Sequence, residues 1–215
     1  MDSSVPFIVI EGNIGAGKTS LAQLLSKDLN GRLILERFAE NPFLPKFYNE
    51  PKRWAFATEL SFLADRYKQL KEELFQPSLF DHYIIADYYF MKSLIFSKQT
   101  LDEDEFMLYQ QLFEIIYTNI PRPNLFIYLH CPIPKLLHQI QIRGRSYEIN
   151  ITANYLLNIH NNYMEFIETQ QNIPILIVNT EALDFVNNST DYEKIKTNLL
   201  NKINKPGIHK LFFYE

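Results

Sequence analysis

Continuous apolar runs recur along the chain and predict strands that are buried on both faces. The first run reads VPFIVIE, and a later one reads LFIYL. Short apolar runs without alternating polar positions are typical of parallel strands covered by helices on both sides. The five predicted strands are Val5–Glu11, Arg32–Glu36, Tyr83–Ala86, Leu125–Leu129 and Pro174–Val178.

Between the strands, apolar residues are spaced by three and four positions, which predicts helices. The segment 40–54 is instead predicted to be a loop, because Pro42, Pro45 and Pro51 interrupt it. The predicted helices are Thr19–Leu29, Phe56–Phe75, Tyr89–Ser97, Glu103–Tyr117, Ile133–Ile142, Ala153–Gln170 and Tyr192–Ile203.

This alternation of strands and helices predicts an α/β fold. Right-handed crossovers would place helices on both faces of a five-stranded parallel sheet, giving a three-layer α/β/α sandwich. The chain has 215 residues, of which 47% are hydrophobic and 21% charged. Those values suit one globular domain over residues 1–215.

Charge and composition narrow the function classes. The net charge is −4 and no Lys/Arg run occurs, so we expect no nucleic-acid polymer as a partner. The single cysteine, Cys131, is expected to be a buried thiol in a reducing compartment. The N-terminus lacks a signal-peptide pattern, and no apolar run approaches the roughly 20 residues of a membrane span. We therefore expect a cytoplasmic protein with no membrane partner.

The strongest chemical signal is GNIGAGKT at 12–19, which matches the phosphate-binding loop (P-loop) pattern G-x-x-x-x-G-K-[ST] between a predicted strand and a helix. It predicts a P-loop NTPase fold, in which backbone N–H groups and the helix N-terminus bind phosphate oxygens. Lys18 is expected to reach the β- and γ-phosphates of ATP, and Thr19 to ligate Mg²⁺. The expected nucleotide-binding residues are Gly12, Asn13, Ile14, Gly15, Ala16, Gly17, Lys18, Thr19 and Ser20.

The metal needs a second anchor, a carboxylate on a neighbouring strand tip, and two aspartates compete for that role. We favour Asp87, because it directly follows the predicted strand YIIA at the sheet edge where the P-loop lies. Asp81 lies in a polar stretch and is expected to be a turn residue.

Two further charged features fit phosphoryl transfer. Arg143 and Arg145 flank a glycine; alone they suit a solvated helix end, but together with a P-loop they predict a lid over 139–150 that closes on the phosphates. Glu36 ends the second predicted strand, where a carboxylate can accept a proton from an attacking hydroxyl. Its position also fits an ordinary surface glutamate.

The order of these motifs resembles the deoxynucleoside kinase family, in particular the short bacterial deoxyguanosine/deoxyadenosine kinases. The resemblance extends from the P-loop to about Phe185, and rests on GNIGAGKT, LERFAENPF, KFYNEPKRWAFATELSFLADRY, YIIADYYFMKSLIF and IRGRSYE. It implies transfer of the ATP γ-phosphate to the 5′-OH of a purine deoxynucleoside in nucleotide salvage, by a homodimer.

The resemblance also implies roles for individual residues. Glu36 would be the general base for the 5′-OH, and Arg66 would steady Glu36 and the nucleoside. Tyr48 and Glu148 would hold the 3′-OH, and Tyr48 would disfavour a 2′-OH. With the base-pocket walls Trp54 and Phe62, the implied substrate-binding residues are Glu36, Tyr48, Trp54, Glu59, Phe62, Arg66, Asp87 and Glu148.

The chain departs from the family pattern at several positions. Arg37 stands where proline is usual. The acidic-Arg-Ser motif reads DYY at 87–89, so its arginine is missing, and Lys92 one turn on is the candidate substitute. Gln139 replaces a further lid arginine. Binding of the donor nucleotide is therefore expected to differ from that in relatives.

Glu59 is the departure with the clearest consequence, because many relatives carry glutamine there. Guanine presents two adjacent donors that an ionised carboxylate can accept, whereas adenine presents a donor beside an acceptor. A mispaired buried group costs roughly 1–3 kcal/mol. We therefore expect deoxyguanosine to be preferred over deoxyadenosine, unless Arg66 neutralises Glu59 and the carboxylate contacts no base.

Two other functions share part of this pattern. A nucleoside monophosphate kinase has the same P-loop, lid and sheet, but needs more cations for the acceptor phosphate than this aromatic region offers. A GTP-dependent switch protein would need an N-K-x-D motif after a late strand. The nearest string, NKIN at 201–204, lacks the aspartate and lies in the last predicted helix.

Overall fold

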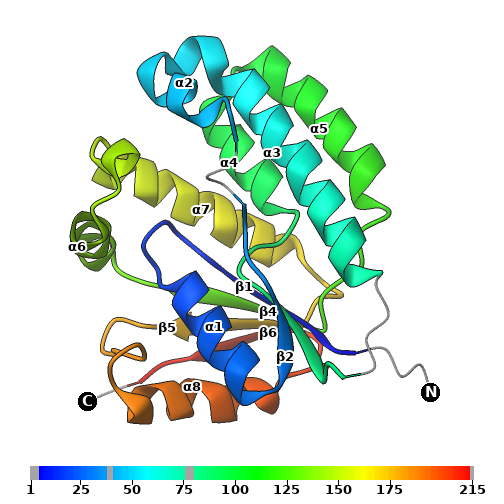
Figure 1. The fold of residues 1–215 in the computed structure, drawn as a ribbon, viewed down its shortest axis with the longest axis vertical. Coiled ribbons are helices and arrows are strands. Elements are labelled where there is room, and N and C mark those ends of the chain that lie inside the picture. The colour runs from blue at the N-terminus through cyan, green and yellow to red at the C-terminus, as the bar shows by residue number, and fades with distance from the viewer. Residues whose placement is uncertain (1–4, 38–40, 76–79, 214–215) are drawn as a thin grey trace. The chain divides into compact units, whose positions relative to one another are not determined.

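The computed structural model describes residues 5–37, 41–75 and 80–213, and contains a six-stranded sheet in the order β2-β3-β1-β4-β5-β6 (Figure 1). Every neighbouring pair runs parallel. The α/β prediction and the five expected strands are confirmed. The strands are β1 (Phe7–Gly12), β2 (Gly31–Ile34), β3 (Tyr83–Ala86), β4 (Leu125–His130), β5 (Ile175–Asn179) and β6 (Ile208–Leu211).

The predicted number of five strands is wrong, because β6 adds to the sheet beside β5, with Ile208 opposite Ile175. Its sequence, IHKL, alternates between exposed and half-buried positions. An edge strand is covered less than a central one, so it needs no continuous apolar run. The sequence pattern that revealed the other strands is therefore missing here.

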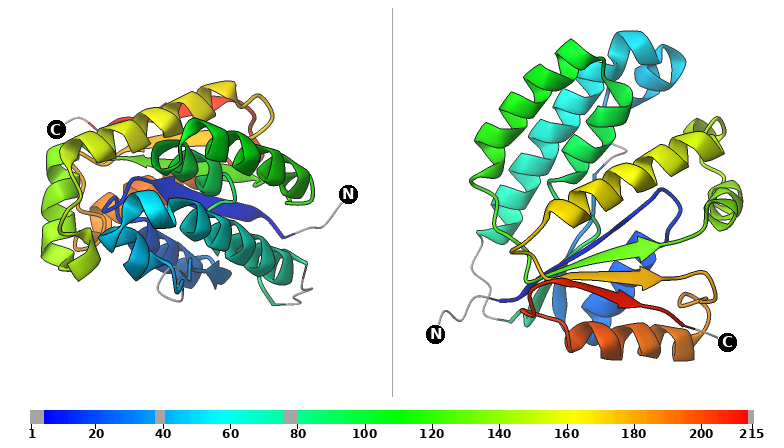
Figure 2. Two further views of the ribbon diagram at one scale, coloured as in Figure 1. Left: turned by 90° about the horizontal axis from the view of Figure 1, so that it is seen from above. Right: turned by 180° about the vertical axis from the view of Figure 1, so that it is seen from behind.

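Helices cover both faces of the sheet, as the two views of Figure 2 show. Helices α1 (Lys18–Asp28) and α8 (Ser189–Leu200) lie on one face, and α7 (Ala153–Thr169) lies on the other. α6 (Ile133–Arg143) follows β4. The buried residues of α1 and α8 share one apolar cluster with alternate residues of the strands. This arrangement confirms the three-layer sandwich.

Four more helices follow β2 and β3: α2 (Leu44–Asn49), α3 (Pro51–Leu74), α4 (Lys92–Thr100) and α5 (Glu103–Tyr117). The predicted loop at 40–54 is wrong over most of its length, because α2 occupies 44–49 and the start of α3 occupies 51–54. Residues 41–43 and 50 are not helical, and residue 40 lies outside the described residues. Pro45 and Pro51 lie in the first turns of these helices. Proline is tolerated there because the first N–H groups have no intrahelical partner.

The chain divides into two compact units. The first unit contains Met1–Leu35, Ser78–Tyr89 and Arg122–Glu215, and holds the sheet with its flanking helices. The second contains Glu36–Pro77 and Phe90–Pro121, and holds α2 to α5. The single domain over 1–215 stays a prediction.

Two predictions from composition concern the cysteine and membrane spans. Cys131 is 7% exposed, and burial raises the pKa of its thiol, which confirms a buried thiol. Within the described residues, no helix combines the length and the apolar character that crossing a bilayer requires.

Candidate active site

The P-loop links β1 to α1 in the first unit. Gly17 precedes the helix at φ 86°, in the left-handed region, and a Cβ at this position would lie 2.8 Å from Phe185 Cζ. At Gly12, a Cβ would lie 2.8 Å from the carbonyl oxygen of Leu129. Side chains at these two positions would therefore clash as well as strain the backbone, which explains why the loop needs glycine there.

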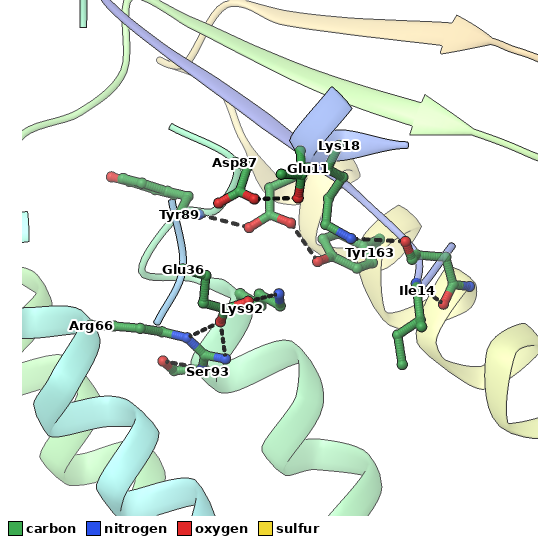
Figure 3. A network of polar contacts seen from close by, with 12 residues as sticks. Glu11, Ile14, Lys18, Glu36, Arg66, Asp87, Tyr89, Lys92, Ser93 and Tyr163 are labelled. Carbon is green, nitrogen blue, oxygen red and sulfur yellow. Dashed lines mark hydrogen bonds and ion pairs between the residues drawn. The ribbon is translucent and has the colours of Figure 1, made fainter. Parts of the chain in front are cut away.

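Asn13 anchors the loop from within. Its side chain donates to the Leu156 carbonyl at 2.7 Å and accepts from the Ile14 N–H at 2.9 Å, and the residue is only 2% exposed. Lys18 Nζ donates to the Asn13 carbonyl at 2.9 Å, so its ammonium group lies against the loop (Figure 3). The motif predicted Asn13 as a loop member, but not its bond to α7.

Of the two competing aspartates, Asp87 lies next to the P-loop. The Thr19 hydroxyl donates to Asp87 Oδ2 at 2.6 Å, and Asp87 is 6% exposed. Asp81 Oδ2 lies 3.2 Å from Arg32 Nε instead, in an ion pair at the start of the sheet strands. A hydroxyl and a carboxylate side by side are a suitable oxygen set for Mg²⁺.

Glu11 is a buried carboxylate that the sequence analysis did not single out. It is 1% exposed, accepts from the Tyr89 N–H at 2.7 Å, and accepts from the Tyr163 hydroxyl at 2.7 Å (Figure 3). These bonds hold the end of β1 to the segment after β3 and to α7. The signal was a lone acidic residue inside an apolar strand.

The predicted lid arginines both pair with Glu148. Arg143 Nη2 lies 2.5 Å from Glu148 Oε2, and Arg145 Nη1 lies 3.4 Å from Oε1. Each arginine side chain is 34% exposed, whereas Glu148 is buried. Gly144 ends α6 in the left-handed conformation, at φ 66°. Glu148 therefore fixes two guanidinium groups, one on the last residue of α6 and one just beyond it, as a phosphate clamp would require. The lid itself stays a prediction.

In the second unit, Glu36 is the centre of a charged cluster. Arg66 donates to Glu36 Oε1 through Nε at 2.9 Å and Nη2 at 2.7 Å, and Lys92 Nζ donates to Oε2 at 2.5 Å (Figure 3). Arg66 Nη1 also donates to Ser93 Oγ at 2.9 Å. The prediction that Arg66 steadies Glu36 matches this geometry, while Ser93 was not foreseen.

Two cations outweigh burial at Glu36. Burial raises the pKa of the Glu36 carboxyl, but Lys92 and Arg66 attract the charged form and donate to it, so the pKa falls to about 2. The carboxylate is therefore ionised at any physiological pH.

Glu36 and Arg66 also line a cavity of about 430 Å³ in this unit. Of the predicted acceptor residues, Phe62 joins them there, and Arg66 packs over its ring at 4.9 Å. Tyr48, Trp54 and Glu59 are not among its lining residues. Trp54 packs against Phe43 at 6.0 Å instead.

Glu59 lies on α3, 6% exposed, and accepts a hydrogen bond from Thr100 Oγ1 at 2.8 Å. Burial raises the pKa of the Glu59 carboxyl to about 7, although Arg66 and Thr100 lower it. The hydrogen bonds of Arg66 go to Glu36 and Ser93. The carboxyl group of Glu59 is therefore close to its midpoint of ionisation at neutral pH.

The structure also accounts for the altered motif at 87–89. Tyr88 and Tyr89 are completely buried, and the Tyr89 ring packs against Phe126 at 6.4 Å. These residues therefore belong to the core. Lys92, 8% exposed, brings a cation to Glu36, which supports its role as the substitute for the missing arginine.

Comparison with known proteins is consistent with these features. A family model described as deoxynucleoside kinase matches residues 8–204. The chain is 37% identical over 203 residues to a deoxyguanosine kinase of Bacillus subtilis (strain 168), covering 90% of this chain and 95% of that protein. It is 30% identical over 193 residues to a deoxyadenosine/deoxycytidine kinase of the same organism, covering 87% and 88%. A solved structure of deoxyadenosine kinase from M. mycoides with bound dCTP matches with a TM-score of 0.76 at 27% identity, covering 91% and 99%. The chain therefore belongs to the deoxynucleoside kinase family.

Proposed function

We propose that this phosphotransferase moves the γ-phosphate of ATP to the 5′-OH of purine deoxynucleosides in nucleotide salvage, with deoxyguanosine preferred over deoxyadenosine. The observation that carries the proposal is the ionised Glu36 carboxylate, held by Arg66 and Lys92 in the same helical unit as the buried Glu59 carboxyl. The family assignment favours a nucleoside acceptor over a nucleoside monophosphate or a switch protein.

The P-loop supplies the donor site in this proposal. Its N–H groups and Lys18 would hold the phosphates of ATP, and Arg143 and Arg145 would offset charge that develops during transfer. Thr19 and Asp87 would hold Mg²⁺, which neutralises phosphate charge when bound. Their hydrogen bond brings two oxygen ligands together beside the P-loop, which fits such an ion.

Glu36 would accept the proton of the acceptor hydroxyl. The 5′-oxygen attacks the γ-phosphorus, and its proton passes to a carboxylate oxygen of Glu36. The bond between the γ-phosphorus and the β–γ bridging oxygen breaks, which gives the nucleoside 5′-monophosphate and ADP. Arg66 and Lys92 hold the carboxylate in one orientation, so that little reorganisation is needed during the reaction.

Purine choice would depend on Glu59. In its ionised form the carboxylate accepts from both N1–H and N2–H₂ of guanine, whereas adenine would leave one oxygen facing a lone pair. The similarity to the Bacillus deoxyguanosine kinase supports this choice. In the remaining part of the proposal, Tyr48 and Glu148 hold the 3′-OH, and Trp54 and Phe62 help to wall the base pocket.

We expect deoxyguanosine to exceed deoxyadenosine in kcat/KM by about 10- to 100-fold at pH 8, where Glu59 is ionised. Pyrimidine deoxynucleosides should be poor substrates, because they leave part of a purine-sized pocket empty. Glu59→Gln should narrow the purine gap, since an amide can rotate to suit either base. The measurement is kcat/KM for all four deoxynucleosides with both proteins.

Glu103→Gln is the matched control, because it makes the same change at an exposed position of α5, away from the cavity that Glu36 and Arg66 line. It should leave the ratio of the two purines unchanged. If deoxyadenosine is preferred at pH 8, or if Glu59→Gln leaves the ratio unchanged, the account of base choice is wrong although the kinase assignment stands.

Asp87→Asn is expected to raise the Mg²⁺ concentration for half-maximal rate by at least about tenfold, because an amide is a weaker ligand than a carboxylate. Asp81→Asn is the natural control, since this aspartate pairs with Arg32 instead of Thr19. Mg²⁺ titrations of the initial rate distinguish the two variants. A larger effect at Asp81 would move the metal site away from Thr19.

We also keep a cytoplasmic location and a homodimer as parts of the proposal. The apolar segments Leu94–Phe96 and Leu112–Tyr117 favour a helical dimer face. Helix α5 exposes Met107, Leu108 and Ile115, at 52%, 50% and 69%, which supports an apolar contact surface on this helix.

A further inference from the structure

Helices α3 and α4 present matched polar residues to each other. Thr100 Oγ1 donates to Glu59 Oε1 at 2.8 Å, and Arg66 Nη1 donates to Ser93 Oγ at 2.9 Å. The two residues on α3 and the two on α4 have the same separation, about two helical turns. The helices therefore run antiparallel, with one hydroxyl on α4 for each of these two ionisable side chains on α3.

The Thr100 hydroxyl has one proton and three acceptors within reach: Glu59 Oε1 at 2.8 Å, the Phe96 carbonyl at 3.3 Å and the Ser97 carbonyl at 3.5 Å. The shortest bond goes to the carboxyl group, and a bond to an ionised acceptor is the strongest. With a protonated Glu59, the hydroxyl can accept and turn its own proton to Phe96. Thr100 can therefore pair with either form, but it favours the ionised one.

Charged groups from several segments face Glu59. Burial raises the pKa of the Glu59 carboxyl most, Arg66 on the same helix and the Thr100 hydrogen bond lower it, Glu36 raises it, and Lys92 on α4 lowers it. These effects balance at about 7. A change in any one of them therefore alters the charge of Glu59 at neutral pH.

Tyr109 on α5 is the remaining titratable neighbour. Its hydroxyl donates to the Glu59 backbone carbonyl at 3.3 Å, and burial together with the Glu59 charge raises the pKa of the phenol, so it stays neutral. Among the residues that the structure describes, Thr100 is the one hydrogen-bond donor to the Glu59 carboxyl group.

We propose that Thr100 is a specificity-determining positioning residue, whose hydroxyl holds Oε1 of Glu59 and favours the ionised carboxylate that reads guanine. This inference rests on the proposed function. Ionised Glu59 offers two acceptors to guanine. Protonated Glu59 offers a donor and an acceptor, which match N1 and N6–H₂ of adenine. Purine choice then depends on pH, with the preference for deoxyguanosine lost as the pH falls through the pKa of about 7.

Thr100→Val removes the hydroxyl and keeps the side-chain shape. Loss of a hydrogen bond to a charged group raises the pKa of Glu59, so the ratio of kcat/KM for deoxyguanosine to that for deoxyadenosine should fall about tenfold at pH 7.5. The pH midpoint of this ratio should move upward by about one unit. Thr100→Ser restores a hydroxyl and should recover both values; Thr100→Ala repeats the test if the valine variant fails to fold.

A double variant distinguishes positioning of Glu59 by Thr100 from a general effect on packing. In a Glu59→Gln background, Thr100→Val should change the purine ratio by less than about twofold, because no ionisable group remains to be tuned. An equally large change in that background would overturn the proposal, as would an unchanged ratio and pH midpoint in folded Thr100→Val. If the unmodified protein phosphorylates no deoxynucleoside, the proposed function fails, and this inference fails with it.

Discussion

Lys18→Ala is expected to lower the rate of phosphoryl transfer by about 10³-fold or more. The side chain is the one cation that the P-loop motif itself directs at the β- and γ-phosphates, where charge shifts during transfer. Its ammonium group lies against the loop, 2.9 Å from the Asn13 carbonyl. Steady-state rates with saturating deoxyguanosine and ATP give the measurement.

The fold should tolerate this substitution, because Lys18 is only half-buried in the first turn of α1 and alanine is a good helix former. Lys27→Ala is the matched control, since Lys27 is exposed on the same helix. Both variants should unfold within a few degrees of the unmodified protein. Substantial turnover by a correctly folded Lys18→Ala protein would contradict the P-loop assignment.

The sequence pattern revealed the central strands because each is buried on both faces. A strand such as β1 has six consecutive buried residues, so its apolar run is continuous. The edge strand β6 has none that is fully buried, and its pattern does not differ from that of a loop. In 40–54 the prolines predict a loop, whereas Pro45 and Pro51 lie in the first turns of α2 and α3, where proline is favourable.

The candidate site likewise has one part that the sequence predicts and another that it does not. The P-loop could be predicted because its residues are consecutive, and Glu36 because it ends a recognisable strand. The hydrogen bonds from Thr100 to Glu59 and from Arg66 to Ser93 could not be predicted, because they depend on the register between two separate helices. Glu11 was missed because a buried carboxylate is unexpected until its two donors are seen.

Glu36→Gln is expected to lower kcat by about 10²-fold or more while nucleoside affinity is largely retained. A general base acts mainly in the transition state, so its loss affects turnover more than binding. The expected fall corresponds to about 2.7 kcal/mol or more of transition-state stabilisation. Single-turnover rates and equilibrium binding of deoxyguanosine together separate the two effects.

The environment of Glu36 also determines how activity and stability depend on pH. Because Lys92 and Arg66 lower its pKa to about 2 against burial, Glu36 should contribute no acid limb to kcat/KM above about pH 4. The same shift stabilises the fold above the unfolded pKa near 4.5, and this stability is lost as the pH falls toward 2. Glu36→Gln therefore removes a stabilising partner of two cations at neutral pH.

The kinetic comparison must allow for that loss of stability. Glu36→Gln should unfold several degrees lower than the unmodified protein, because Arg66 and Lys92 keep their charges without the carboxylate. Rates are therefore compared well below the unfolding transition. Glu168→Gln, at an exposed site on α7, provides the matched control and should change neither rate nor stability. If deoxyguanosine binding is lost while the single-turnover rate at saturation survives, Glu36 binds the nucleoside and another group accepts the proton.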